Sequence, residues 1–61
     1  MTYNFKIAKD MAMALASRFG VGYVNYSEGG GGYYATTCMT ARTIGSMSKA
    51  GKFSVCQKQR Y

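Results

Sequence analysis

Apolar residues recur every four positions over the first third of the chain, which places them in one stripe along a helix. The stripe consists of Ile7, Met11, Leu15 and Phe19, and alanines widen it at Ala8, Ala12 and Ala16. Polar residues fill most of the opposite arc. The pattern predicts an amphipathic helix that begins near residue 5, ends at Gly20 and anchors the fold.

Both ends of this predicted helix carry suitable capping residues. The side-chain oxygen of Thr2 or Asn4 can accept a hydrogen bond from a backbone N–H group of the first turn. Gly20 suits the left-handed backbone conformation that commonly ends a helix. Met13 breaks the pattern because it lies in the polar arc, where it is either a single exposed apolar residue or a contact for a partner.

After Gly20 the pattern changes to short runs rich in Val, Tyr and Thr, which favour strands. Residues 21–27 and 33–39 predict two strands, and the glycine-rich run 29–32 between them predicts a hairpin connection. Residues 52–58 predict a last strand after a turn at 48–51.

Residues 40–48 fit two structures. Thr40 could cap a short helix, but Gly45 and several hydroxyl residues are weak helix formers, so we favour a continuing strand with a bulge or kink at Gly45. We therefore expect an α+β fold over residues 1–61 as a single domain, with one N-terminal helix packed on a small antiparallel sheet. The expected order is α-β-β-β, a meander, and the alternative is α-β-β-α-β.

The two turns also predict a strand register and therefore two sheet faces. A first turn centred on Gly30 and a second turn at residues 48–51 predict these pairs: Val24 with Thr36, Tyr26 with Tyr34, Met47 with Lys52, and Ile44 with Val55. The face toward the helix would collect Val24, Tyr26, Tyr34, Cys38, Ile44, Phe53 and Val55. The other face would collect Tyr23, Asn25, Tyr33, Thr37, Met39, Lys52, Cys56, Lys58 and Arg60. Cys38 and Cys56 would then point to opposite faces and remain free thiols.

The charge balance narrows the class of partner. Eight Lys and Arg residues against two acids give a formal net charge of +6 over 61 residues. Such a density of positive charge attracts polyanions, with nucleic acid first and an anionic membrane surface or an acidic protein second.

Catalysis and metal binding have little support in the sequence. The chain has no His, which is the usual general base, and its only acids are Asp10 and Glu28, eighteen positions apart. Two widely spaced cysteines without His form no recognisable zinc site. We expect a non-catalytic protein without cofactor or metal.

The strongest candidate site is the sheet face away from the helix. It combines Tyr23 and Tyr33 with the cations Lys52, Lys58 and Arg60, and exposed aromatic rings beside cations are what single-stranded nucleic acid binds. The alternative is a small inhibitor or modulator that binds a protein, through this face or with Met13 as an additional contact, and a homodimer is compatible with either.

The ends and the hydropathy suggest where the protein acts. The first twenty residues predict a helix of the fold rather than a signal peptide, and no apolar run reaches the roughly 18 residues of a membrane span. We therefore expect a cytoplasmic protein whose cysteines are reduced.

Overall fold

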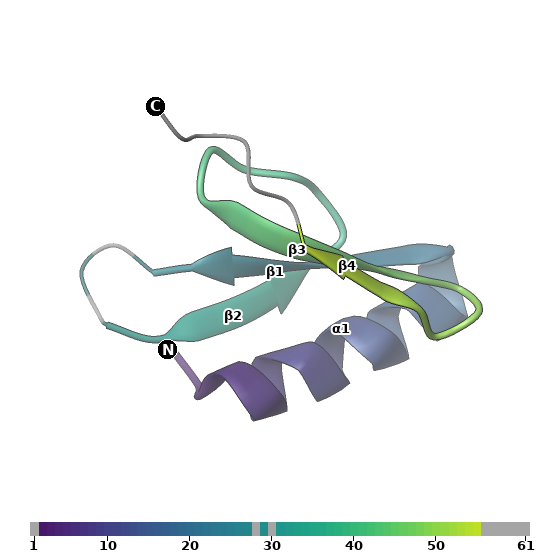
Figure 1. Ribbon diagram of the computed structural model, residues 1–61, viewed down its shortest axis with the longest axis horizontal. Helices are drawn as coiled ribbons and strands as arrows, with labels where there is room; N and C mark the ends of the chain where they lie inside the picture. Colours follow the sequence, from purple (N-terminus) through teal and green to yellow (C-terminus); the bar gives the residue numbers. More distant parts are fainter. Residues whose placement is uncertain (1, 28, 30, 56–61) are drawn as a thin grey trace.

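One helix packs against one face of a four-stranded antiparallel sheet in the computed structural model, which describes residues 2–27, 29 and 31–55 (Figure 1). The elements are α1 (Phe5–Phe19), β1 (Val21–Tyr26), β2 (Tyr33–Thr36), β3 (Thr43–Ser48) and β4 (Phe53–Val55). The predicted α+β class, with a single N-terminal helix on an antiparallel sheet, is confirmed. In the described part of the chain, no helix combines the length and the apolar character that a membrane crossing requires.

The capping residues fix the bounds of α1 as expected. The side-chain oxygen of Asn4 accepts from the N–H of Ile7 at 2.9 Å. At the other end Gly20 adopts φ 99° and donates its N–H to the carbonyl of Ala16 at 2.8 Å. A residue with a side chain adopts this backbone conformation only at a cost, so Gly20 defines the end of the helix.

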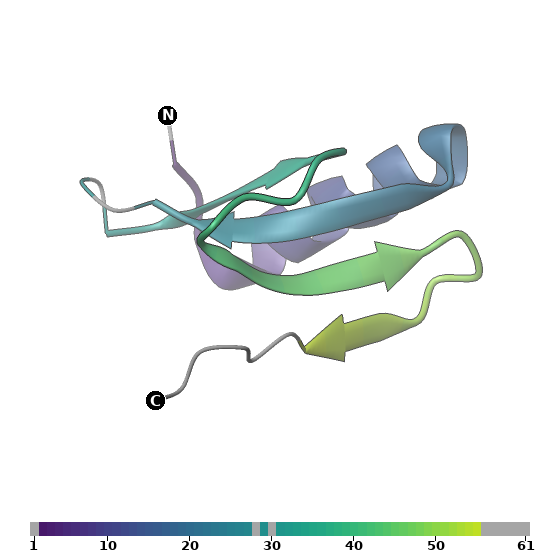
Figure 2. The ribbon, with the colours of Figure 1, turned by 90° about the horizontal axis from the view of Figure 1, so that it is seen from above.

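The sheet has four strands in the order β2-β1-β3-β4 rather than the three expected. Residues 33–48 are not one bent strand, because residues 37–42 leave β2, pass over β1 on the side away from α1, and return the chain to start β3 (Figure 2). Residues 43–48, which the alternative order placed in a helix, form a strand.

The hairpin register differs from the prediction by one residue in both turns. Tyr26 pairs with Tyr33 and Val24 with Ala35, because the first loop closes with the Ser27 N–H on the Gly32 carbonyl at 2.8 Å. The centre of that loop therefore lies before Gly30.

In the second turn Met47 pairs with Phe53 instead of Lys52, and Gly45 pairs with Val55. The loop holds only three residues, since Ser48 donates its N–H to the Lys52 carbonyl at 2.9 Å and Gly51 adopts φ 86°. A left-handed residue at the end of a three-residue hairpin loop is a common arrangement.

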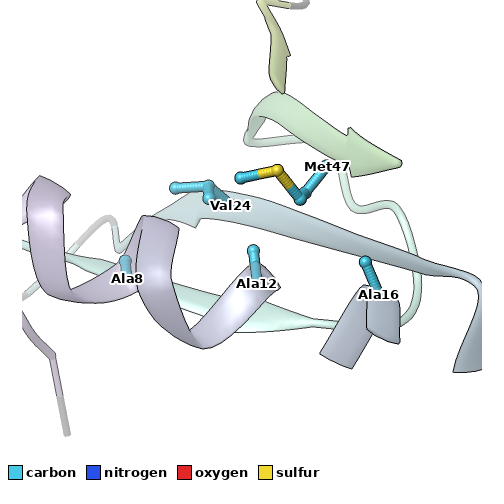
Figure 3. Close-up of a cluster of buried hydrophobic side chains, with 5 residues drawn as sticks. All are labelled: Ala8, Ala12, Ala16, Val24 and Met47. Atoms are coloured by element: carbon cyan, nitrogen blue, oxygen red, sulfur yellow. The ribbon is translucent and has the colours of Figure 1, made fainter. Parts of the chain in front are cut away.

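The core lies between α1, β1 and β3 and is lined on the helix by small residues (Figure 3). Its fully buried apolar side chains are Ala8, Ala12, Ala16, Val24 and Met47. The prediction that Ile7 and Phe19 belong to the buried stripe is wrong, because 44% and 63% of their surfaces remain exposed. The stripe of alanines, not the stripe of larger residues, faces the sheet.

Two glycine residues of the sheet leave room for the groups that pack against them. A Cβ at residue 22 would overlap the backbone carbonyl of Ala12, so α1 approaches β1 closely only because residue 22 is glycine. Gly45 is covered by the ring of Phe53, where a Cβ would also overlap. The irregularity next to Gly45, where Asn25 pairs with Thr43 and residue 44 is extra, matches the expected bulge.

The helix does not cover the whole sheet. It packs on β1, β2 and β3, but its backbone does not approach β4. The side chain of Phe53 connects β4 to the helix, because its ring lies 5.8 Å from the ring of Phe5 and 5.3 Å from the Lys9 ammonium. The outer part of β4 extends beyond the helix.

Candidate binding surface on the sheet

The face of the sheet away from α1 carries mainly hydroxyl and aromatic side chains. Because side chains alternate along a strand, partners in the observed register share a face. The residues on this face are Val21, Tyr23, Asn25, Tyr34, Thr36, Thr43, Ser46, Ser48 and Ser54. We call it the open face, since α1 lies on the other side.

One end of the open face is closed by the 37–42 crossover, which is fastened to Asn25. This side chain is fully buried. Its amide donates to the Thr36 hydroxyl at 2.8 Å, and its carbonyl accepts from the hydroxyls of Thr43 at 2.6 Å and Thr40 at 3.3 Å. The Thr36 hydroxyl in turn donates to the carbonyl of Cys38 at 2.8 Å. The network satisfies a buried amide and holds the crossover over β1.

The other end of the open face, toward β4, is not covered by the described residues. Tyr23 is half-buried and pairs with Ser46, which pairs with Ser54 on β4. The Lys52 carbonyl accepts a hydrogen bond from the Ser48 N–H at 2.9 Å, so Lys52 is paired with Ser48. Because paired residues share a face and Ser48 lies on the open face, Lys52 belongs to this surface as well. Lys49 is exposed in the adjoining turn. Tyr23, the two serines and Lys52 thus form a row that runs from an aromatic ring through hydroxyl groups to an ammonium group.

The structure brings some of the predicted site residues together and separates others. Tyr23 and Lys52 share the open face, as expected. Tyr33 does not, and this prediction is wrong: Tyr33 packs toward α1, with its ring 5.4 Å from that of Phe5 and 5.5 Å from that of Tyr26. The one-residue change in the first hairpin moves Tyr33 to the helix face.

By the same change Tyr34 replaces Tyr33 on the open face. Tyr34 pairs with Asn25, two positions along β1 from Tyr23, although it had been assigned to the helix face. Lys58 and Arg60 lie outside the described residues.

The contact candidate Met13 is 45% exposed on α1, on the other side of the sheet from Tyr23.

The hydroxyl residues of the open face were not recognised as site residues from the sequence. Ser46 and Ser54 come together only through the β3–β4 register. The available indication was the alternation of Ser with larger residues along β3 and β4, which is typical of strands with one solvent-facing side.

The charge around the open face is one-sided. Asp10 is exposed on α1, so it lies on the opposite side of the sheet, and Glu28 lies outside the described residues. The described residues of the open face therefore include no carboxylate, while Lys52 and the neighbouring Lys49 carry positive charge. Such a surface attracts anions at long range.

Neither a metal nor a thiol centre is evident among residues 2–27, 29 and 31–55. No three His, Cys, Asp or Glu side chains of this part come close enough together to hold a metal ion. Cys38 is a free, exposed thiol in the crossover rather than in a strand. The predicted relation of Cys38 to Cys56 concerns a residue outside the described part.

Comparisons with known proteins do not add a family to this description. No family model matches the chain, and no curated protein or solved structure is significantly similar to it.

Proposed function

We propose that this protein is a non-catalytic module that binds single-stranded nucleic acid on the open face of its sheet. The observation that carries the proposal is the row from Tyr23 through Ser46 and Ser54 to Lys52, which contains a ring, hydroxyls and a cation but no carboxylate. Bases stack on aromatic side chains, and Lys neutralises phosphates.

The roles of the residues follow from their chemistry. Tyr23 supplies a half-buried ring at the β1 end of the uncovered area, on which one base stacks. Lys52 and Lys49, at the β3–β4 turn, contact phosphates, and the hydroxyls of Ser46 and Ser54 donate to phosphate or sugar oxygens. These groups recognise the backbone and the flat faces of bases, so base preference is weak.

Charge supports a nucleic acid over a neutral ligand. The formal net charge of +6 adds a long-range attraction that is independent of sequence and sensitive to salt. In this proposal the protein acts in the cytoplasm, where nucleic acid is abundant and Cys38 remains a thiol.

Binding of a labelled single-stranded oligonucleotide, followed by fluorescence anisotropy at 50 and 200 mM salt, tests the proposal. Two phosphate contacts, by Lys52 and Lys49, predict that the affinity for a single strand falls about sevenfold between the two concentrations. Replacing Tyr23 by Ala removes a base stack, which is worth about 1–3 kcal/mol.

Matched variants separate stacking from other effects. Tyr23→Phe keeps the ring and should retain most of the affinity, whereas Tyr23→Ala should lose it. Lys52→Ala should lower both the affinity and its salt dependence. An oligonucleotide that does not bind at 50 mM salt, or that binds Tyr23→Ala as well as the wild type, would show that the open face is not a nucleic-acid site.

A protein partner is the second candidate, and a separate observation favours it. Val55 on β4 is 68% exposed and Met13 on α1 is 45% exposed, and both lie on the helix side of the sheet rather than on the open face. Exposed apolar side chains next to an uncovered strand are typical of protein contacts. In this alternative the module inhibits or modulates the protein that it binds.

A further inference from the structure

The β4 strand presents unused backbone hydrogen-bonding groups at the edge of the sheet. In an antiparallel pair, residues alternate between those that bond their partner strand and those that point away from it. Ser48 bonds Lys52 at 2.9 Å, so Ser46 and Ser54 form the next bonded pair. The N–H and C=O groups of Phe53 and Val55 therefore point outward, where no described segment pairs with them.

The opposite edge of the sheet, at β2, is paired at one position with another segment of the chain. The outward groups of Tyr33 on β2 are bonded to Tyr3, with both N–H···O distances 2.8 Å. The chain thus closes one edge at this point with its own N-terminal segment. An edge that stays unpaired is a template for an added strand.

The helix-side flank of β4 is apolar and partly uncovered. The Phe53 ring is held by Lys9, whose ammonium lies 5.3 Å from the ring centroid, so this side of α1 faces β4. Met13 lies one turn after Lys9 on the same side of the helix. Because α1 does not extend over β4, Val55 is exposed there. A strand added to β4 would bury Val55 on this flank.

The charges around β4 indicate the chemistry of the added strand. Lys52 lies on the open-face side of β4 and Lys9 lies on the helix side. Asp10 is the only acidic residue in the described part of the chain, and it is exposed on α1. A second copy of the chain would bring its own Lys52 to this edge and carries the same +6 charge, so like charges would meet. An acidic segment would be attracted instead.

We propose that β4 binds an extended segment of a partner protein in which apolar residues alternate with Asp or Glu. The segment adds a fifth strand through the backbone of Phe53 and Val55. Its apolar residues lie on the helix side against Val55, and its acids lie on the other side near Lys52. Strand addition of this kind takes affinity from the backbone and specificity from alternate side chains.

The test uses a fluorescent eight-residue peptide in which Val and Glu alternate, with a peptide of alternating Val and Lys as the charge control. The wild type should bind the first peptide and not the second. Val55→Pro removes an outward N–H without touching the β3–β4 ladder, and it should weaken binding about fivefold. Val55→Ile keeps both the N–H and the apolar side chain, so it should bind like the wild type.

Two further measurements separate this site from the nucleic-acid site and from a folding defect. Tyr23→Ala should leave peptide binding unchanged, whereas Lys52→Ala should weaken the binding of both ligands. In the wild type, added peptide should slow the hydrogen exchange of the Phe53 and Val55 amides.

Three results would overturn the proposal. The first is that Val55→Pro binds the glutamate peptide as tightly as the wild type does, and the second is that the wild type binds the lysine peptide as tightly as the glutamate peptide. The third is that the free protein has twice the mass of one chain and that Val55→Pro restores the mass of one chain, which would make a second copy the occupant of the edge.

Discussion

Gly22 of β1 lies directly against the backbone carbonyl of Ala12 in α1, so close that a Cβ at residue 22 would overlap the carbonyl oxygen. On the helix the contact is continued by Ala8 and Ala16, both fully buried. The separation of helix and sheet is thus set by residues with little or no side chain. A larger group at this contact must push the two layers apart.

Replacing Gly22 by Ala should destabilise the protein by more than about 2 kcal/mol, because the added methyl meets backbone atoms that cannot rotate away. Urea unfolding followed by circular dichroism measures the change in the free energy of unfolding. Gly29→Ala is the control, since nothing lies within 4 Å of a Cβ at that position. Equal stability of Gly22→Ala and the wild type would contradict the close contact.

Replacing Asn25 by Ala should cost about 2–3 kcal/mol, because it removes the hydrogen bonds of the buried amide to the hydroxyls of Thr36 and Thr43. The crossover should also exchange its amide hydrogens faster. A double-mutant cycle with Thr43→Val measures the 2.6 Å bond directly. Additive effects of the two substitutions would mean that this bond does not hold the crossover.

Tyr33 and Tyr34 should respond differently to substitution, although they are neighbours in the sequence. Tyr33→Ala removes a ring that contacts Phe5 and Tyr26 beside the core, so it should cost about 3 kcal/mol of stability. Tyr34→Ala, on the open face, should cost clearly less. Comparison of their unfolding midpoints tests the observed register, and the reverse order would support the register predicted from the turns.

The bounds of α1 and the α+β class could be predicted because local chemistry determines them. Asn4 caps the first turn of the helix and Gly20 ends it, and neither depends on distant residues. The alternation of faces in β1 was also correct, since Tyr23 and Val24 lie on opposite sides of the sheet.

The register could not be predicted, because the run Gly29 to Gly32 offers no side chain that fixes the centre of the loop. The crossover was missed for a related reason. Residues 36–43 are rich in Thr, which favours a continuous strand, but β2 ends at Thr36 and β3 begins at Thr43. The side chains of Thr36, Thr40 and Thr43 bond Asn25, which is distant in the sequence, and this contact holds the crossover between the two strands. The one-residue difference in the first hairpin register puts Tyr34 on the open face, where Tyr33 was predicted.

The buried side of α1 was misjudged because size suggested that Ile7 and Phe19 face the core. The surface that the helix packs on decides which of its sides is buried: a Cβ at Gly22 would overlap the backbone of Ala12, so only small helix residues fit at this distance. Met47 was likewise missed, since its position in the core depends on pairing with Phe53. Both errors concern contacts between segments that the local pattern does not encode.

The most direct test of the account is to map the nucleic-acid contact by NMR, with a single-stranded oligonucleotide added to the labelled protein at 50 mM salt. We predict that the amide resonances of Tyr23, Ser46 and Ser54 shift on addition, while those of Ala8 and Ala12, beneath the sheet, do not. Shifts confined to the outer side of α1, or none at all, would contradict the assignment of the open face as the binding surface.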